Sequence, residues 1–425
     1  MVASVTPRGF SRSCPAIRRL CHDLPMTPRR ARAAAAAAFL AQGLVFISLT
    51  TRLPDFSERW DLSELDLSLL LLMMVLLAGV GSVASESLAR RLDSAALLRL
   101  GLGLVTVAVP VLTTAPEAAV FVGGLAVYGV GLGVVDASTN MQAVALEHRY
   151  GRPILPSFHG AWTLGGVAGA ALTLATGGLP LSATAAVAVV PLALLAAPFL
   201  RRDHGPATEP TVDAAAVAVP WRPILLVGLG MVLFYMVDTA AATWGPTYLD
   251  RTFDTPSGLV ALATFPYLLA SGGLRLAGDR LVGRYGAVLV LRVGALVASA
   301  ALAVVVFAPT WPVAVLGFTL LGAGVAVIAP LSFSAAARIA GGVEVDPAVR
   351  QARVDAVIAR FNQFNYVGAL LGAVLTGLVG AGSLRVGFAV PMVLILGILP
   401  LARAFAGAGG APVSAPRPSG VGSAS

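Results

Sequence analysis

A carboxylate and an amide lie inside one long apolar segment of the chain, residues 117–143. Asp136 is followed four residues later by Asn140, so on a helix the two side chains share a face. A carboxylate in a bilayer-spanning helix costs roughly 3 kcal/mol on insertion scales and normally faces a bundle interior or a water-filled cavity. A low dielectric also favours its neutral form, which suits reversible protonation. We hypothesise that Asp136 binds a proton or a substrate; a structural hydrogen bond at a helix interface is the alternative.

Two further ionisable side chains lie in apolar segments. Asp238 falls in the last third of the segment 222–247, expected on the outer side, where it is either a second proton or substrate group or an interfacial carboxylate reaching water. Trp244 and Tyr248 follow it and indicate an aromatic belt at the membrane surface. His159 is a candidate proton relay because its unperturbed pKa is near 6.5. It lies near the start of its segment, so a hydrogen bond to a neighbouring loop is the competing role.

Polar residues also cluster near the start of the segment 356–380. They are Asn362, Gln363, Asn365 and Tyr366. Amides at Asn362 and Asn365 could bind a sugar-like solute when a cavity opens toward the cytoplasm, and ordinary polarity at a helix end is the alternative. Small residues four apart recur in three segments and favour close helix packing. These pairs are Gly129 with Gly133, Gly165 with Gly169, and Gly368 with Gly372.

The composition requires a bilayer around these segments. The 425-residue chain is 57% hydrophobic and only 12% charged, whereas soluble domains contain about 25% charged residues. All 29 basic residues are arginine, and they gather in short turns between apolar runs. The net charge of +8 is therefore typical of cytoplasmic loops and not of a nucleic-acid surface.

Several kinds of chemistry are not supported by the residues. Without lysine the chain cannot contain a G-x-x-x-x-G-K-[ST] phosphate loop, which excludes ATP-driven transport by this chain. Of the four histidines only His159 lies in an expected span, and both cysteines, Cys14 and Cys21, lie in the amino-terminal tail. We expect no enzyme activity, no cofactor and no metal site.

The apolar runs predict an all-α membrane protein with about twelve spanning helices, because a span needs about 20 apolar residues. The expected spans are 31–50, 66–87, 96–114, 117–143, 156–178, 181–200, 222–247, 257–278, 286–308, 311–334, 356–380 and 385–404. A Pro- and Ala-rich connection with mixed charge divides them into two sets of six. We expect a disordered cytoplasmic tail over 1–30, a six-helix bundle over 31–200, a linker over 201–221, a second six-helix bundle over 222–404 and a disordered tail over 405–425.

The connections alternate in charge along the chain. Basic turns contain Arg90 and Arg91, Arg149 and Arg152, Arg201 and Arg202, Arg280 and Arg284, and Arg338, Arg350 and Arg353. The turns between them are acidic, neutral or nearly uncharged. By the positive-inside rule both termini are cytoplasmic, which agrees with an even number of spans. We expect a monomer in the inner membrane of a bacterium, with the lipid bilayer, a small solute and protons as its partners and no nucleic acid.

Four stretches resemble one family. They are R-L-P-D at Arg52–Asp55, G-V-G-L-G-V-V-D-A-S-T-N-M-Q-A with the turn E-H-R-Y-G-R-P and F-H-G-A-W-T-L-G-G-V-A-G-A, D-T-A-A-A-T-W-G-P-T-Y-L at Asp238–Leu249, and G-G-L-R-L-A-G-D-R-L-V-G-R-Y-G at Gly272–Gly286. They are similar to major facilitator superfamily transporters of the branch related to fucose permease and the YbjJ-type inner-membrane proteins. The resemblance spans about Arg32 to Arg403 and implies two six-helix bundles whose first, fourth, seventh and tenth helices line a cavity.

The resemblance also assigns roles to residues. The fourth helix of fucose permease carries a coupling carboxylate, and this supports a proton-binding role for Asp136. Arg275, Asp279, Arg280 and Gly286 match the superfamily's inter-helix motif and form a candidate cytoplasmic gate. In the first half the equivalent turn departs from that motif, because Arg90 replaces the usual Asp and Asp93 the usual Gly.

These observations predict a secondary active transporter that moves a small solute, coupled to protons, by alternating access. A sugar-type importer and an efflux antiporter for drugs or metabolites both fit. A non-transporting membrane sensor is the remaining alternative, and solute-dependent flux would separate it from both transporters.

Overall fold

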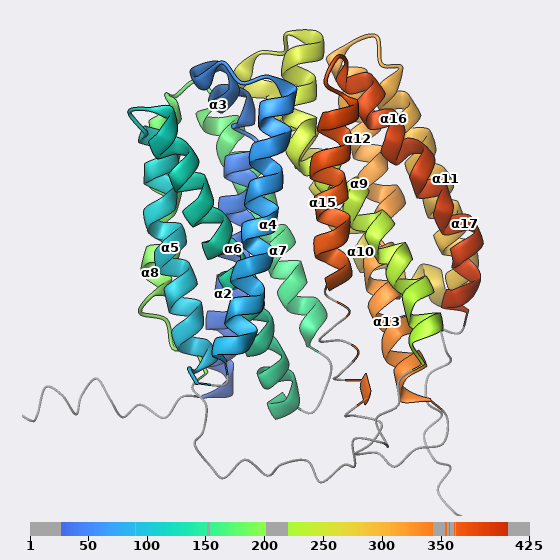
Figure 1. The fold of residues 1–425 in the computed structure, drawn as a ribbon. Helices are drawn as coiled ribbons and strands as arrows, with labels where there is room; N and C mark the ends of the chain where they lie inside the picture. The colour runs from blue at the N-terminus through green and yellow to red at the C-terminus, as the bar shows by residue number, and fades with distance from the viewer. Residues whose placement is uncertain are drawn as a thin grey trace, which may run out of the picture.

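Helices make up every regular element in the described part of the chain (Figure 1). The computed structural model describes residues 27–89, 91–150, 154–200, 220–342 and 363–406, together with Arg353, Val354, Val357 and Phe361. Most of the expected tails and most of the expected linker lie outside these residues, so those domain boundaries stay predictions. The sequence prediction of an all-α membrane protein is confirmed.

Each expected span corresponds to one helix or to two or more consecutive helices. In chain order these are α2 (Pro28–Thr50), α4 (Glu64–Leu88), α5 (Ser94–Thr114), α6 (Ala118–Tyr150), α7 (Leu155–Thr176), η1 (Leu181–Ala188) with α8 (Val189–Leu194), α9 (Trp221–Phe253), η3 (Ser257–Ala263) with α10 (Phe265–Tyr285), α11 (Ala287–Val306), α12 (Trp311–Val325) with α13 (Ile328–Gly341), α15 (Gln363–Val379), and α16 (Leu384–Leu394) with η4 (Ile395–Gly397), α17 (Ile398–Leu401) and η5 (Ala402–Phe405). A short helix that the sequence did not predict, α3 (Leu53–Trp60), follows α2.

Length and apolar composition let most of these helices cross a bilayer. Within the described ranges, nine helices are long and apolar enough to do so, and Leu181–Leu194 and Gln363–Val379 are shorter apolar helices. α7 has 22 residues, which is about 33 Å at 1.5 Å per residue and enough for a hydrocarbon core of about 30 Å. The spans therefore differ from the expected ones in length and not in their order.

Local sequence signals set several helix ends. Ser63 and Asp66 form a capping box at the start of α4, where the Ser63 side chain accepts from the Asp66 amide at 3.2 Å. Gly286 separates α10 from α11 with φ +79°, a left-handed conformation that glycine adopts without strain. Pro266 lies in the first turn of α10, where its missing amide hydrogen costs nothing, and the span breaks there into η3 and α10.

The helices form two bundles that stand side by side (Figure 1). The amino-terminal bundle contains α2 to α8 and the carboxy-terminal bundle contains α9 to η5. They meet along α4 with α15, and along α7 with η3 and α10. We call the end that carries α3, at the top of Figure 1, the upper end, and the end that carries Leu92 and Tyr285 the lower end.

The two bundles repeat one structural device. In the amino-terminal bundle, Arg99 of α5 donates from Nε to the carbonyl of Leu195, just after α8, at 3.0 Å. In the carboxy-terminal bundle, Arg292 of α11 donates from Nε to the carbonyl of Leu399 in α17 at 3.2 Å. In both cases the third spanning helix of a bundle holds a carbonyl in its last spanning segment. This repetition is typical of transporters built from two related bundles.

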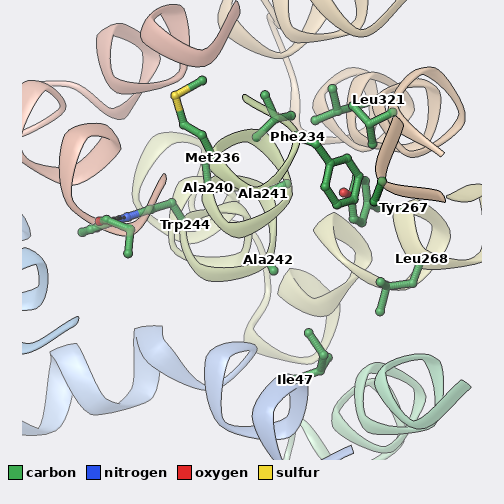
Figure 2. Close-up of a cluster of buried hydrophobic side chains, with 14 of the residues drawn as sticks. Ile47, Phe234, Met236, Ala240, Ala241, Ala242, Trp244, Tyr267, Leu268 and Leu321 are labelled. Carbon is green, nitrogen blue, oxygen red and sulfur yellow. Dashed lines mark hydrogen bonds between the residues drawn. The ribbon is translucent and has the colours of Figure 1, made fainter. Parts of the chain in front are cut away.

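α9 forms the centre of the carboxy-terminal bundle, and apolar side chains leave it in several directions (Figure 2). Trp244 and Tyr248 are fully buried there, so the predicted aromatic belt is wrong. The Trp244 indole donates to the carbonyl of Ala373 at 2.8 Å, and the Tyr248 hydroxyl donates to the carbonyl of Val305 at 2.6 Å. α9 continues to Phe253, and both rings are packed among α11, α15 and α16 instead of facing lipid.

Candidate functional site

Asp136 lies near the middle of α6, inside the membrane-spanning part of the amino-terminal bundle. One carboxylate oxygen, Oδ1, accepts a hydrogen bond from Nε2 of Gln42 in α2 at 3.2 Å. The other, Oδ2, accepts a hydrogen bond from the hydroxyl of Tyr366 in α15. Gln42 belongs to the same bundle as Asp136, whereas Tyr366 belongs to the other. The carboxylate therefore joins the two bundles at the centre of the molecule.

Asn140 lies one turn further along α6, as the sequence spacing predicts. Its Nδ2 donates to the main-chain carbonyl of Asp136 at 2.9 Å. The amide thus binds the backbone of α6 and not the Asp136 carboxylate, which leaves the carboxylate to the other helices. The structure places Asn140 beside the site, where it holds the local helix geometry.

Asp238 lies close to the middle of α9, because this helix runs from Trp221 to Phe253. The expectation that Asp238 lies in the last third of its span is therefore wrong. Its carboxylate accepts a hydrogen bond from the hydroxyl of Tyr267 in α10. Both residues belong to the carboxy-terminal bundle, so this pair links neighbouring helices within one bundle.

A tyrosine lies near both carboxylates, and an arginine lies near that tyrosine and near Asp238. Tyr235 is within electrostatic reach of Asp136, Asp238 and Arg275. Arg275, on α10, donates from Nε to the carbonyl of Ala326 at 3.1 Å and from NH1 to the Thr163 hydroxyl of α7 at 3.2 Å. Two carboxylates, one guanidinium and several tyrosines thus gather where the bundles face each other, an arrangement that can bind polar solutes and protons.

Arg275 is consequently not part of a turn at the membrane surface, as the inter-helix motif implied. Its guanidinium carbon lies 5.9 Å from the ring centre of Phe234, and its bond to Thr163 reaches the amino-terminal bundle. Arg280 is exposed near the end of α10, and Gly286 makes the turn after that helix. The structure therefore separates Arg275 from the other residues of the candidate gate. The side chain of Asp279 lies outside the described residues.

His159 lies in the first turns of α7 among aromatic rings. Its ring centre is 5.5 Å from that of Phe39 in α2 and 6.2 Å from that of Phe333 in α13. Among the described residues its side chain makes no hydrogen bond to a loop, so that expectation is not met. His159 instead packs at the boundary between the two bundles, because Phe333 belongs to the carboxy-terminal one.

The polar cluster at the start of α15 is only partly described. Asn365 is half-buried in α15 and directly precedes Tyr366. Asn362 lies outside the described residues. Asn365 therefore lies beside the residue that binds Asp136.

Sequence reasoning missed three members of this centre. Gln42 was a findable signal, because it is the one amide in the alanine-rich first span. Tyr235 was also findable, because it lies three residues before Asp238 and so shares a helix face with it. Tyr267 gave no signal, because its partner Asp238 lies in another helix. In the described part of the chain no group of three His, Cys, Asp or Glu side chains could hold a metal ion.

Two cavities lie inside the amino-terminal bundle. One is lined by Gln42, whose amide binds Asp136, and by Val45, Tyr128 and Val135 among others. The other lies toward the upper end and is almost entirely apolar, with Phe46 and Phe121 in its lining. Both cavities have a mainly apolar lining and so differ from the polar centre between the bundles.

Known proteins are similar to this chain in sequence and in fold. A family model described as Major Facilitator Superfamily matches residues 3–152. The uncharacterized transporter y4wD of Sinorhizobium fredii (strain NBRC 101917 / NGR234) is 30% identical over 315 residues, which cover 71% of this chain and 81% of that protein.

Solved structures have the same architecture at low sequence identity. The nucleoside transporter NupG has a TM-score of 0.64 with 14% identity, covering 89% of this chain and 98% of NupG. A variant of the E. coli fucose:proton symporter FucP has a TM-score of 0.53 with 16% identity, covering 88% of this chain and 98% of FucP. The chain belongs to the Major Facilitator Superfamily and is a multi-pass membrane transporter.

Proposed function

We propose that this transporter moves a small polar solute together with protons, by alternating access between the two sides of the inner membrane. The observation that carries the proposal is Asp136, a carboxylate at mid-helix that is bound by one side chain from each bundle. Such a group can exchange a proton with water whenever either side of the molecule opens. Its protonation would then bias how the bundles sit against each other.

The polar centre supports a solute that makes hydrogen bonds. Tyr235, Asp238 and Arg275 add donors and acceptors beside Asp136. FucP is named as a fucose:proton symporter and NupG as a nucleoside transporter, and both names describe polar solutes. These names support a sugar-like solute for this chain, which the experiment below tests against amphiphilic drugs.

The charge of the connections supports one orientation. Arg91 and Arg284 lie at the lower end, whereas Glu64, Asp61 and Asp254 lie at the upper end. Because positive charge is retained in the cytoplasm, we place the lower end there, and with it both termini.

Flux into liposomes tests the proposal. The purified full chain is reconstituted with a trapped pH dye, and sugars, sugar acids and amphiphilic drugs are added in turn. Asp136→Asn is compared with Asp61→Asn, which removes an exposed carboxylate at the upper end. We expect one class of polar solute to change the internal pH. We expect this solute-dependent pH change to be at least tenfold smaller in Asp136→Asn and unchanged in Asp61→Asn.

Other outcomes contradict the proposal in defined ways. A pH change that survives in Asp136→Asn would remove the proton role from this carboxylate. A response to amphiphilic drugs alone would favour an efflux antiporter. Labelled solute that moves with no pH change would refute proton coupling, and no movement of any solute would favour the sensor.

A further inference from the structure

The centre of the molecule contains two tyrosine–aspartate hydrogen bonds that differ in what they connect. The hydroxyl of Tyr267 donates to Asp238, and both residues lie in the carboxy-terminal bundle. The hydroxyl of Tyr366 donates to Asp136, and these residues lie in different bundles. The chemistry of the two bonds is the same. Only the second bond must break or rearrange when the bundles move apart.

Close helix packing fixes Asp136 and its amide partner within the amino-terminal bundle. A Cβ added at Gly43, next to Gln42, would lie 2.1 Å from the carbonyl oxygen of Trp162, so α2 and α7 touch backbone to backbone. A Cβ at Gly133, one turn before Asp136, would lie 1.8 Å from the carbonyl oxygen of Ala78 in α4. Such contacts hold helices in one relative position. The carboxylate therefore moves with its bundle.

Tyr366 is fixed to the other bundle in the same way. A Cβ at Gly368, two residues further along α15, would lie 2.6 Å from the Cβ of Tyr235 and 2.6 Å from the carbonyl oxygen of Val232 in α9. α15 thus lies directly against α9 where it carries Tyr366. Because each partner is mounted on a rigid bundle, the hydrogen bond between Tyr366 and Asp136 depends on how the two bundles are placed.

We propose that Tyr366 is the positioning residue that converts protonation of Asp136 into movement of the two bundles. A carboxylate accepts the tyrosine hydrogen bond, and a hydrogen bond to an ionised group is roughly twice as strong as one between neutral groups. When a proton from water binds Oδ2, that oxygen becomes a donor and Tyr366 must turn away or bind more weakly. Protonation therefore loosens a central contact between the bundles. This inference rests on the proposed function, which makes Asp136 the proton site.

Other titratable groups surround Asp136 and define the controls. Tyr235 and Asp238 face the centre from α9, Arg275 from α10 and His159 from α7, whereas α2 contributes the neutral Gln42. On α5, Arg99 binds carbonyls after α8, and on α4 the described acidic residues Glu64 and Asp66 lie in the first turn. Of the two tyrosine hydroxyls bonded to these carboxylates in the described residues, only that of Tyr366 crosses between bundles.

Distances between spin labels test the proposal without a solute. In the full chain with Cys14→Ser and Cys21→Ser, labels are attached through Leu92→Cys and Tyr285→Cys, which are exposed at the lower end of the two bundles. Distance distributions are measured in lipid nanodiscs between about pH 5 and pH 8. The parent, Tyr366→Phe and Tyr267→Phe are compared, because each tyrosine variant removes one hydroxyl from one aspartate.

We expect the ratio of the two distance populations in the parent to change about fivefold across this pH range. We expect Tyr366→Phe to change less than about twofold, with a distribution near that of the parent at low pH. Tyr267→Phe should keep the parental change, since its bond lies within one bundle. Asp136→Asn should remove the pH dependence as Tyr366→Phe does.

Three results would overturn the inference. They are a parental pH response in Tyr366→Phe, an equal loss of the response in both tyrosine variants, and the absence of any response in the parent. Unlabelled Tyr366→Phe is also tested for pH-dye flux with each solute that the parent moves, and a variant that retains solute movement is folded. These distances are independent of flux, so a failed flux experiment refutes the proposed function and an unchanged distance response refutes this inference alone.

Discussion

Arg251, near the end of α9, forms an ion pair with Glu64, the first residue of α4, with 2.6 Å between NH1 and Oε1. The same guanidinium donates to the hydroxyl of Ser57 and to the carbonyl of Leu62. These contacts join the carboxy-terminal bundle to α3 and α4 of the amino-terminal bundle. Arg251 therefore closes the upper end, in a different layer of the molecule from Asp136.

Removing this contact should open the upper end. Both side chains are about a quarter exposed, 25% for Arg251 and 24% for Glu64, and ion pairs of this kind contribute at most about 1 kcal/mol. We expect Arg251→Gln to raise the population with a separated upper end up to about fivefold. The measurement is the distance between spin labels at Glu117→Cys and Thr310→Cys, which lie at the upper end of the two bundles.

Arg59→Gln is the matched control for this variant. Arg59 also lies at the upper end, but it donates to the carbonyls of Thr113 and Ala115 within its own bundle. Its loss should leave the distance distribution unchanged. Exchange of the charges in Arg251→Glu with Glu64→Arg should restore closure in part. Identical distributions in Arg251→Gln and the parent would show that this ion pair does not hold the upper end.

The packing of α7 against α2 predicts a strong effect of one methyl group. A Cβ at Gly165 would lie 2.0 Å from the carbonyl oxygen of Leu40, so Gly165→Ala must push the two helices apart. Overpacking of this kind costs about 1–3 kcal/mol or more. We expect a lower midpoint of thermal unfolding in detergent. Gly103→Ala in α5, where an added Cβ meets no atom within 4 Å, should leave the midpoint equal or higher.

If Gly165→Ala unfolds at the same temperature as Gly103→Ala, the close approach of α2 and α7 is not rigid. That result would also weaken the argument that Asp136 and Gln42 move as one unit. The comparison therefore tests both the stability of the protein and whether close packing of α2 on α7 holds Gln42 in place beside Asp136.

The acidic loop at the upper end predicts a pH dependence of stability. Burial raises the pKa of Asp55 above its ordinary value of 3.8, although the neighbouring Arg52 guanidinium, 3.0 Å away, opposes this. The folded protein then holds this proton more tightly than the unfolded chain, so protonation stabilises the fold. This contribution is present below the ordinary pKa and is lost as the pH rises through the raised one.

Thermal unfolding of Asp55→Asn against the parent measures this effect. The neutral amide cannot ionise, so the variant should gain stability relative to the parent as the pH rises from about 4 to about 7. Asp61→Asn, which removes an exposed carboxylate from the same loop, should follow the parent. A difference between Asp55→Asn and the parent that stays constant with pH would mean that Asp55 ionises normally in the folded protein.

The helical class of the protein and the order of its helices followed from the sequence alone. Runs of about 20 apolar residues leave the backbone no alternative to a helix in a bilayer, so local composition determines where each helix lies. The same reasoning identified Asp136, because a carboxylate in such a run must find polar surroundings. The charges in the connections predict that the lower end faces the cytoplasm, and this orientation stays a prediction.

Only the tertiary structure decided which side chains meet. Gln42 and Tyr366, the partners of Asp136, are 94 and 230 positions away in the chain. Trp244 and Tyr248 read as an aromatic belt because local sequence does not show which side of a helix faces lipid and which faces other helices. Arg275 lies near the centre and not in a turn, because α10 extends from Phe265 to Tyr285 and packs against α7. Contacts between bundles depend on how whole helices pack, and no short stretch of sequence contains that information.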